Sequence, residues 1–372
     1  MIKKIGYLVF AFCFSVFRLV PLNPRKVFFV ATHDDSPEGN IGITAAAIRQ
    51  NMPEKRCIFL TRRDGIHRPF SFFFGKAFHM ATAATIFLDN EFMPMAYTPI
   101  SSRAKVVQLW HGTGTIKKFG LDSDTGEVAR LAQKANRRLT HLIVNSEQTK
   151  KQYASAFGVS EDRIFILGLP RTDLILDAEK MQQLRENFYE QYPELRQKSC
   201  TLYAPTFRDS EVEKPVFGLD FDSLVSCMEE EEVLLVRLHP HVAAHCPVDL
   251  WDKYKGKIVN VSDYPGAATL LAVSGRLITD YSSIIFEYCL LDGELLFYAY
   301  DYESFQREGR DFYENYPEFV PGPVAYSQTE LEKLWENPGD NRLRRQQFCE
   351  QTFRYLDKNA TKRLLELIFG KK

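Results

Sequence analysis

A histidine followed by a glycine-rich turn is the clearest chemical signal in this 372-residue chain. His111 closes the apolar run of the segment QLWHGTGT, and Gly112 and Gly114 follow it at once. A histidine can accept a proton near neutral pH, and glycines let a substrate approach the backbone closely. The segment favours a general base for a hydroxyl nucleophile. The alternative is a histidine whose ring is bound by backbone groups at a strand end.

A second basic cluster closes another apolar run. Arg237 and His239 stand at alternate positions before Pro240, so both side chains would leave the strand on the same side and could hold an anion. His241 and His245, four residues apart, could be drawn as metal ligands together with Cys246. No carboxylate accompanies them, so we expect no metal and assign His239 to phosphate.

The segment TDYSS lies between an apolar strand and a buried helix. Asp280, Ser282 and Ser283 would cap that helix, and the hydroxyls with the free N–H groups would bind phosphate. Glu287 lies about one turn further along the helix, where it could reach a ribose hydroxyl. Capping alone is the other explanation of the serines.

Two further turns each release an arginine from a strand end. Arg171 stands in GLPRTD, and Thr206 and Arg208 stand in YAPTFRD. Either turn alone is typical of an ordinary solvent-facing loop. The sequence contains no P-loop, no dinucleotide-binding glycine motif and no zinc-protease helix motif.

The elements that must position these residues form two series. Short apolar runs alternate with helix-like segments from Lys26 to Pro170 and again from Ser199 onward, which predicts parallel sheets covered on both faces. We therefore expect an α/β protein of two doubly wound domains facing across a cleft, with ligands outside the carboxyl ends of the strands. The expected segments are an interfacial segment 1–24, a domain 25–172, a helical connector 173–197, a domain 198–340 and a helix pair 341–372 closing the second domain.

Composition narrows the function classes. The net charge of −1 gives no reason to expect nucleic acid, and the seven cysteines lack C-x-x-C spacing. Near the N-terminus an apolar stretch from Ile5 to Phe17 follows Lys3-Lys4 and is too short to span a bilayer. It predicts an uncleaved anchor lying in the membrane interface; the alternative is a first helix packed on the body.

Taken in order, several motifs resemble those of the CDP-glycerol glycerophosphotransferase family of teichoic acid synthesis, which includes polymerases and shorter priming enzymes. The resemblance runs from Val106 to about Pro323 and rests on WHGTGTIKKFG, NSEQTKKQYASAFG, GLPRTD, YAPTFRD, RLHP, LITDYSSIIFEY and REGRDFYENYPEFVPGP. The stretch HGTGTIKKFGL is closer to the priming enzymes than to the polymerases.

The resemblance implies a GT-B-like pair of domains with CDP-glycerol held mainly by the second. It makes His111 the base, and it places His239 and the pair Ser282-Ser283 on the pyrophosphate. Arg171, Thr206 and Arg208 fall in matching motifs without individual roles.

For a priming enzyme the acceptor would be a disaccharide on undecaprenyl diphosphate, at the cytoplasmic face of the membrane, with no cofactor beyond the donor. Two alternatives remain at this point. One is a CDP-ribitol, nucleotide-sugar or polymer-forming enzyme of the same fold, and the other is a non-catalytic, membrane-associated nucleotide-binding protein.

Overall fold

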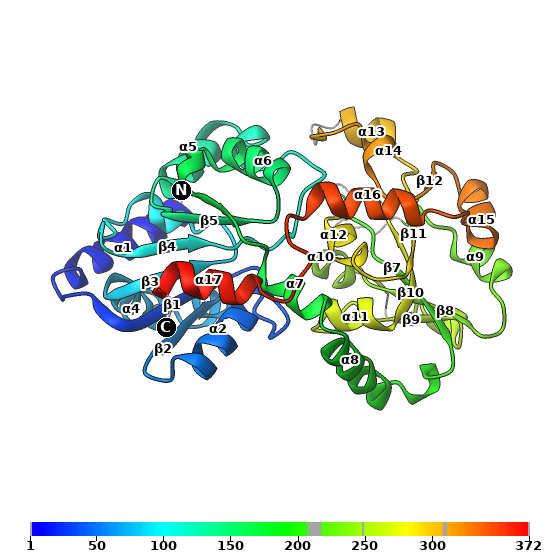
Figure 1. Cartoon of the computed structure of the whole chain (residues 1–372), viewed down its shortest axis with the longest axis horizontal. Coiled ribbons are helices and arrows are strands. Elements are labelled where there is room, and N and C mark those ends of the chain that lie inside the picture. The colour runs from blue at the N-terminus through cyan, green and yellow to red at the C-terminus, as the bar shows by residue number, and fades with distance from the viewer. Residues whose placement is uncertain (1, 207, 209–216, 248, 308–310, 371–372) are drawn as a thin grey trace. The chain divides into compact units, whose positions relative to one another are not determined.

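The computed structural model describes residues 2–206, 208, 217–247, 249–307 and 311–370. The chain divides into two compact units, each built on one parallel sheet (Figure 1). Unit 1 comprises Met1–Gly114, Lys118–Asp173 and Thr352–Lys372, and unit 2 comprises Thr115–Lys117 and Leu174–Gln351. Within the quoted motifs, Phe207, Asp209 and residues 308–310 lie outside the described residues.

The sheet of unit 1 has six parallel strands in the order β2-β1-β3-β4-β5-β6. The strands are β1 (Asn23–Ala31), β2 (Arg56–Thr61), β3 (Ala83–Leu88), β4 (Lys105–Gln108), β5 (His141–Val144) and β6 (Ile164–Ile166). The strand order reverses between β1 and β3. Ligands of open α/β sheets bind outside the carboxyl ends of the strands at such a point.

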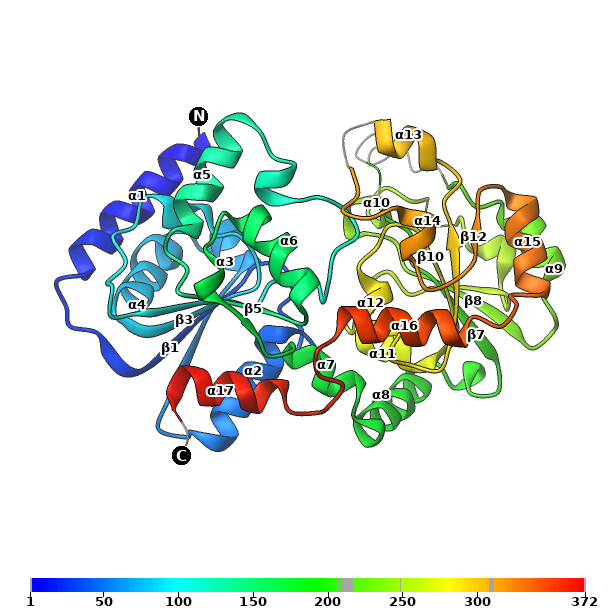
Figure 2. The ribbon, with the colours of Figure 1, turned by 45° about the horizontal axis from the view of Figure 1, so that its top comes forward.

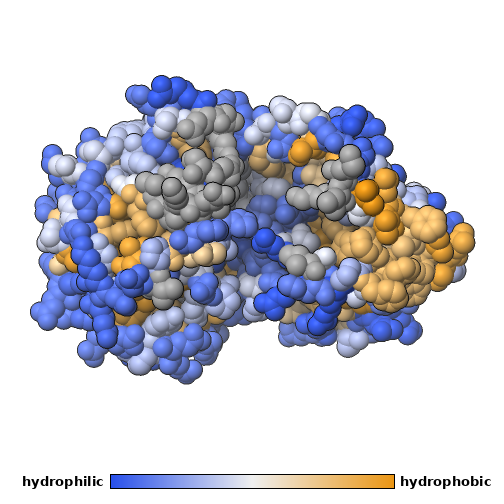
Figure 3. Space-filling model, turned by 180° about the vertical axis from the view of Figure 1, so that it is seen from behind, coloured by the Kyte–Doolittle hydropathy of each residue, from blue (hydrophilic) through white to orange (hydrophobic). Residues whose placement is uncertain are grey.

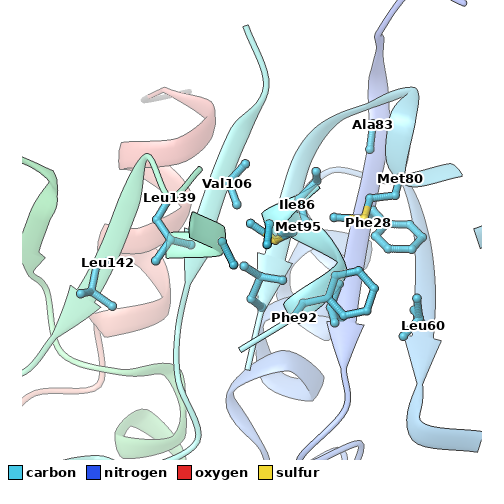
Figure 4. Close-up of a cluster of buried hydrophobic side chains, with 14 of the residues drawn as sticks. Phe28, Leu60, Met80, Ala83, Ile86, Phe92, Met95, Val106, Leu139 and Leu142 are labelled. Atoms are coloured by element: carbon cyan, nitrogen blue, oxygen red, sulfur yellow. The ribbon is translucent and has the colours of Figure 1, made fainter. Parts of the chain in front are cut away.

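Helices cover both faces of this sheet because its strands are apolar on both sides. In β1, Phe28 and Val30 enter one core cluster, whereas Val27 and Phe29 enter another. Figure 4 shows the first cluster. The helical segments of unit 1 are α1 (Ile2–Phe17), α2 (Asn40–Asn51), α3 (Arg62–His67), η1 (Ser71–Lys76), α4 (Ala77–Ala81), η2 (Met93–Ala96), η3 (Gly120–Asp122), α5 (Gly126–Asn136), α6 (Glu147–Phe157), η4 (Glu161–Arg163) and α17 (Ala360–Phe369), with α7 (Pro170–Ile175) at its boundary.

The sheet of unit 2 also has six parallel strands, in the order β12-β11-β10-β7-β8-β9. The strands are β7 (Ser199–Tyr203), β8 (Glu232–Val236), β9 (Ile258–Asn260), β10 (Ser274–Thr279), β11 (Glu294–Tyr298) and β12 (Val324–Ala325). Read from β9, this is the Rossmann order, and its reversal lies between β7 and β10. The two parallel sheets confirm the predicted doubly wound α/β class.

Helices also flank the sheet of unit 2. They are α8 (Ala178–Gln191), η5 (Pro193–Leu195), α9 (Phe221–Cys227), α10 (Pro240–Ala243), η7 (Asp252–Tyr254), α11 (Ala267–Val273), α12 (Ile284–Tyr288), α13 (Tyr302–Arg307), α14 (Tyr316–Phe319), α15 (Gln328–Glu336) and α16 (Arg342–Thr352). Leu224 of α9 and Leu331 of α15 join Val236 and Ile278 of the sheet in one core cluster.

The C-terminal segment differs from the expected helix pair on the second domain. Only α16 belongs to unit 2, whereas α17 packs on the sheet of unit 1 beside α2 (Figure 2). Leu364 and Ile368 of α17 are buried there against β1 and β3 side chains. An amphipathic pattern predicts that a helix buries one face, but it does not say which sheet receives that face.

The N-terminal helix α1 has 16 residues, and no helix among the described residues has both the length and the apolarity needed to cross a membrane. One side of α1 packs on unit 1, where Phe10 and Phe14 are fully buried. Its other side leaves large apolar side chains exposed, including Phe12 at 70%. The buried side agrees with the alternative of a first helix packed on the body, and the membrane anchor stays a prediction.

Candidate active site

His111 lies just beyond β4, at the carboxyl edge of the unit 1 sheet. Its Nδ1 is 3.0 Å from the backbone carbonyl oxygen of Asp89, which follows the neighbouring strand β3. A carbonyl oxygen can only accept, so Nδ1 carries the proton and Nε2 keeps its lone pair. The ring also stacks on His33, with centroids 3.6 Å apart, and lies against Trp110 at 4.1 Å. These contacts fix both the tautomer and the ring plane.

The loop that carries His111 is held by its carbonyl groups. Carbonyls 110, 111, 112 and 113 each accept a hydrogen bond from a different side chain, namely Asn40 (3.1 Å), Arg171 (2.6 Å), Tyr153 (3.3 Å) and Asn145. The donors come from α2, α7, α6 and the end of β5. These hydrogen bonds stabilise an unfavourable backbone conformation, because Trp110 has a φ of 57°, in the left-handed region that bulky residues rarely adopt.

Asp89 organises the loop after β1. Its carboxylate accepts the backbone N–H groups of Thr32 (3.0 Å), His33 (3.2 Å) and Asp34 (2.9 Å). Burial raises the pKa of Asp89 to about 6, although the three N–H donors act in the opposite direction. This carboxylate therefore places His33 against His111 at the reversal of strand order between β1 and β3.

Arg171 joins the same cluster. Its guanidinium donates to the His111 carbonyl and pairs with Asp34 at 2.9 Å, and its backbone N–H donates to Asn40 Oδ1 at 3.0 Å. The structure thus brings together His111, Gly112 and Arg171, three of the residues that the sequence predicted. Arg171 supplies a fixed positive charge next to the candidate base.

The electrostatics keep His111 neutral. Burial lowers its pKa to about 3, the nearby His33 and Arg171 act in the same direction, and the bond to the Asp89 carbonyl opposes them. The pKa of His33 is also lowered, mainly by burial. At physiological pH both rings are therefore uncharged, and His111 is in the form that can accept a proton.

In unit 2 the predicted residues Thr206, Arg208 and Asp280 meet where β7 and β10 lie side by side. Asp280 accepts the backbone N–H of Thr206 and the guanidinium of Arg208, each at 2.8 Å. Arg208 also forms a two-pronged pair with Asp301, with both contacts at 2.8 Å. Asp280 thus resembles Asp89 of unit 1. Each is a buried aspartate that follows a central strand and accepts backbone N–H groups from the loop after the neighbouring strand.

Arg208 is enclosed on all sides. It is 7% exposed, and the rings of Tyr281, Tyr300 and Phe305 lie 5.0 to 5.5 Å from its guanidinium carbon. Burial lowers its pKa, but the charges of Asp280 and Asp301 outweigh that effect and raise it. Its donors are thus engaged inside the protein, and it positions the end of β7.

The hydroxyl group of Thr206 is a candidate ligand-binding group. Its Oγ1 is buried and has no hydrogen-bond partner in the part of the chain that the structure describes. A buried hydroxyl without a partner is costly, so a ligand group that bonds to it would stabilise the site.

The remaining predicted residues of unit 2 are partly or wholly committed to local structure. The Ser282 hydroxyl accepts the N–H of Ile284 at 3.4 Å, and His239 Nδ1 accepts the N–H of His241 at 3.3 Å. Ser283 is partly exposed, and Glu287 is buried at 7% exposure. Within the described residues no group of three His, Cys, Asp or Glu side chains could hold a metal ion.

The sequence interpretation missed most of the supporting residues. His33, Asn40, Asp89, Asn145 and Tyr153 all contact the His111 loop or the loop beside it. His33, Asp89 and Asn145 directly follow apolar strands, in THDD, LDN and VNS, so the rule that sites lie at strand ends could have found them. Asn40 and Tyr153 lie on helices, and no local signal marks them.

Comparison with known proteins agrees with these motifs. The sequence profile of the family described as CDP-glycerol:poly(glycerophosphate) glycerophosphotransferase matches residues 12–370. This chain belongs to that family. The structure of the wall teichoic acid polymerase TagF has a similar fold, with a TM-score of 0.82 at 22% identity over 99% of this chain and 95% of that chain. The fold of this glycerophosphotransferase-family chain is thus GT-B-like.

Curated relatives of this chain are named for two polyol phosphates, ribitol phosphate and glycerol phosphate. The chain is 33% identical to a teichoic acid poly(ribitol-phosphate) polymerase of Bacillus spizizenii, over 99% of this chain and 60% of that protein. It is 29% identical to the ribitol-phosphate primase of the same species, over 94% and 92%, and 28% identical to the glycerol-phosphate primase of Bacillus subtilis, over 87% and 82%. The chain therefore spans about three fifths of the polymerase and most of each primase.

Replacing Arg208 with methionine should destabilise unit 2 strongly. The change leaves the carboxylates of Asp280 and Asp301 without their shared cation, and removing one partner of a buried ion pair costs about 3–5 kcal/mol. Urea unfolding followed by circular dichroism measures the loss. Arg342→Met is the matched control, because its pair with Asp340 is 81% and 62% exposed and is screened by solvent, so its loss should change the unfolding curve little. Equal losses in the two variants would contradict the structural role of Arg208.

The His111 ring should make unfolding dependent on pH. Its pKa lies near 3 in the folded chain and near 6.5 in the unfolded chain, so between these values the unfolded state binds the extra proton and stability falls as the pH falls. The slope from this one group is at most about 1.4 kcal/mol per pH unit. Urea unfolding at several pH values from 6.5 down to 4.5 should show a shallower decline for His111→Asn than for the parent. The raised pKa of Asp89 changes stability with pH in the opposite direction, but Asp89 is present in both proteins, so the comparison isolates the histidine.

Proposed function

We propose that this chain transfers glycerol phosphate from CDP-glycerol to a hydroxyl of a lipid-linked acceptor and releases CMP. The observation that carries the proposal is the geometry of His111, a neutral imidazole with Nδ1 bonded to a carbonyl and Nε2 free to accept a proton. The family profile names CDP-glycerol, and TagF has been soaked with CDPG, which support this donor.

In the proposed reaction His111 Nε2 removes the proton of the acceptor hydroxyl. The oxygen attacks the phosphorus of the glycerol phosphate group, and a new P–O bond forms as the bond to the bridging oxygen breaks. The electron pair of the broken bond leaves on CMP, and the transferred proton stays on His111 until it is lost to solvent. No covalent intermediate with the protein is needed.

The low pKa of His111 sets a condition on this mechanism. An imidazole with a pKa near 3 is a weak base, so its proton affinity must rise when the substrates bind. A diphosphate near the ring would raise it, because a nearby negative charge favours the imidazolium form. Asp89 and His33 keep the ring in place while its charge changes.

On the donor side we assign the phosphates to the edge of the unit 2 sheet. The Thr206 hydroxyl, which lacks a partner among the described residues, would donate to a phosphate oxygen, and Ser282, Ser283 and His239 would supply further contacts. Arg208 and Asp280 would act by holding the turn that carries Thr206. The contact of Glu287 with a ribose hydroxyl stays a prediction; its side chain is 7% exposed.

A second candidate donor is CDP-ribitol. The 33% identical poly(ribitol-phosphate) polymerase and the 29% identical ribitol-phosphate primase favour it as specifically as the glycerol-phosphate primase favours glycerol. The proposed proton transfer is the same for either polyol.

The membrane is the proposed location of the acceptor. Exposed apolar side chains gather on and beside α1, including Phe12 (70%), Leu19 (86%) and Phe70 (76%). Figure 3 shows an apolar area on this part of unit 1. Phe72 of η1 packs on Phe10 of α1 at 5.0 Å, so both elements belong to one surface. We assign this surface, called the α1 face below, to the interface of the cytoplasmic membrane, where aromatic and aliphatic side chains enter the headgroup boundary.

The His111→Ala variant should lose CMP release from CDP-glycerol by about 10²- to 10⁴-fold, the usual worth of a positioned base. The assay mixes the protein, CDP-glycerol and a lipid-linked disaccharide, and mass spectrometry counts the units added. His245→Ala is the matched control, because that histidine is exposed and its ring nitrogen Nδ1 bonds to the nearby backbone carbonyl of His241 at 2.8 Å. Full activity of the His111 variant would refute the base. CMP release only with CDP-ribitol would replace the donor and keep the mechanism.

Charged substitutions on the α1 face should weaken membrane binding. Phe12→Asp with Leu19→Asp removes two exposed apolar anchors and adds negative charge, so sedimentation with anionic vesicles should fall at least tenfold. Leu343→Asp with Leu356→Asp, also exposed but outside the α1 face, serves as the control. Unchanged sedimentation of the first variant would refute the contact.

A further inference from the structure

A basic groove lies between α5 and η2 in unit 1, away from His111. It has a volume of about 260 Å³, and it is lined by Tyr97, Arg130, Leu131, Gln133, Lys134 and Arg137. Arg130, Lys134 and Arg137 are spaced four and three residues apart, so they project from the same side of α5. The volume is below the range of pockets for drug-sized ligands, which suits a small charged headgroup.

The groove carries an excess of positive charge. Lys134 and Arg137 have no ion-pair partner in the described ranges of the chain, and Lys134 Nζ lies 5.3 Å from the centre of the Tyr97 ring. Among the residues that the structure describes, Glu127 is the one carboxylate near Arg130, at 3.8 Å. Glu127 is shared with Lys4 of α1 at 2.9 Å. Glu127 thus approaches two cations at one end of the groove, and the charges of Lys134 and Arg137 are left for an anionic ligand to balance.

The groove borders the α1 face. The Lys4–Glu127 pair joins the start of α1 to the first turn of α5, and η2 contacts both helices. Phe10 of α1 also packs on Phe92, the residue before η2, at 5.5 Å. If the α1 face lies in the headgroup boundary, the groove lies at the level of the lipid phosphates.

We propose that the groove between α5 and η2 binds the phosphate of a membrane lipid headgroup. Arg130, Lys134 and Arg137 donate to the phosphate oxygens, and the Tyr97 ring forms an apolar wall beside them. The site holds unit 1 in one orientation on the bilayer while the α1 face supplies apolar anchoring. The inference rests on the proposed membrane contact and is independent of the transfer reaction.

The test compares two kinds of anionic vesicle. The full chain, Lys134→Gln with Arg137→Gln, and the control Lys151→Gln with Lys333→Gln are sedimented with phosphatidylcholine vesicles doped with phosphatidylglycerol. The same proteins are sedimented with vesicles doped to equal charge with oleate, which has no phosphate. The control removes two exposed helical lysines outside the groove, so the net charge of the two variants matches. Thermal unfolding checks that all three proteins are folded.

We expect the groove variant to lose about tenfold or more of its binding to phosphatidylglycerol, and to match the control on oleate. If the groove variant lost equal binding to both kinds of vesicle, the groove would contribute only general surface charge, and the phosphate site would be overturned. Calorimetry with inorganic pyrophosphate identifies the source of the phosphate. Binding of pyrophosphate that the groove variant loses, with vesicle binding unchanged, would overturn the lipid assignment in favour of a dissolved phosphate.

The α1 variant separates this inference from the membrane contact on which it rests. If Phe12→Asp with Leu19→Asp sediments like the parent while the groove variant loses its preference for phosphatidylglycerol, the α1 contact fails and the phosphate site stands. If the α1 variant loses binding and the groove variant does not, the phosphate site is overturned and the contact stands.

Discussion

Backbone N–H groups in the loops at the carboxyl edge of a parallel sheet need hydrogen-bond acceptors. In each unit the carboxylate of one buried aspartate accepts them. Asp89 receives three successive N–H groups from the loop after β1, and Asp280 receives the N–H of Thr206 after β7. Each aspartate follows a strand next to the reversal of strand order. A buried carboxylate is costly unless it is hydrogen-bonded, so these bonds fix both the carboxylates and the loops.

The two units compensate their aspartates differently. Asp280 is neutralised by Arg208, which is itself enclosed by aromatic rings. Asp89 has backbone donors instead of an arginine, and its pKa is raised. The first arrangement gives a rigid turn whose charges cancel. In the second arrangement the Asp89 carboxylate is bonded to backbone N–H groups and not to a cation. The surroundings of His111, which has to accept a proton, therefore stay polar.

The base is positioned through the backbone as much as through its ring. Four consecutive carbonyls around His111 are held by side chains from four elements, and Trp110 adopts a left-handed conformation between them. Strain of this kind persists only where the surroundings over-determine it, which is typical of functional sites. On another side of unit 1, α1 buries Phe10 and Phe14 in the core while it exposes Phe12, so a single helix joins the fold to the proposed membrane surface.

The sequence alone determined the features that depend on local pattern. Apolar runs of strand length separated by amphipathic segments gave the two doubly wound sheets, and ordered motifs gave the family and the candidate base at His111. The sequence also singled out Arg208, because its motif follows a strand. The ion pairs of Arg208 with Asp280 and Asp301 were not predicted, since Asp301 lies 93 residues away in the chain.

Only the tertiary structure decided which distant residues meet. His33 stacks on His111, Asn40 holds the Trp110 carbonyl, and α17 crosses back to the sheet of unit 1. The physical reason is that parallel strands adjacent in a sheet are separated in sequence by whole helices. Local periodicity therefore shows that a strand end or an apolar face needs a partner, while strand order and packing select that partner.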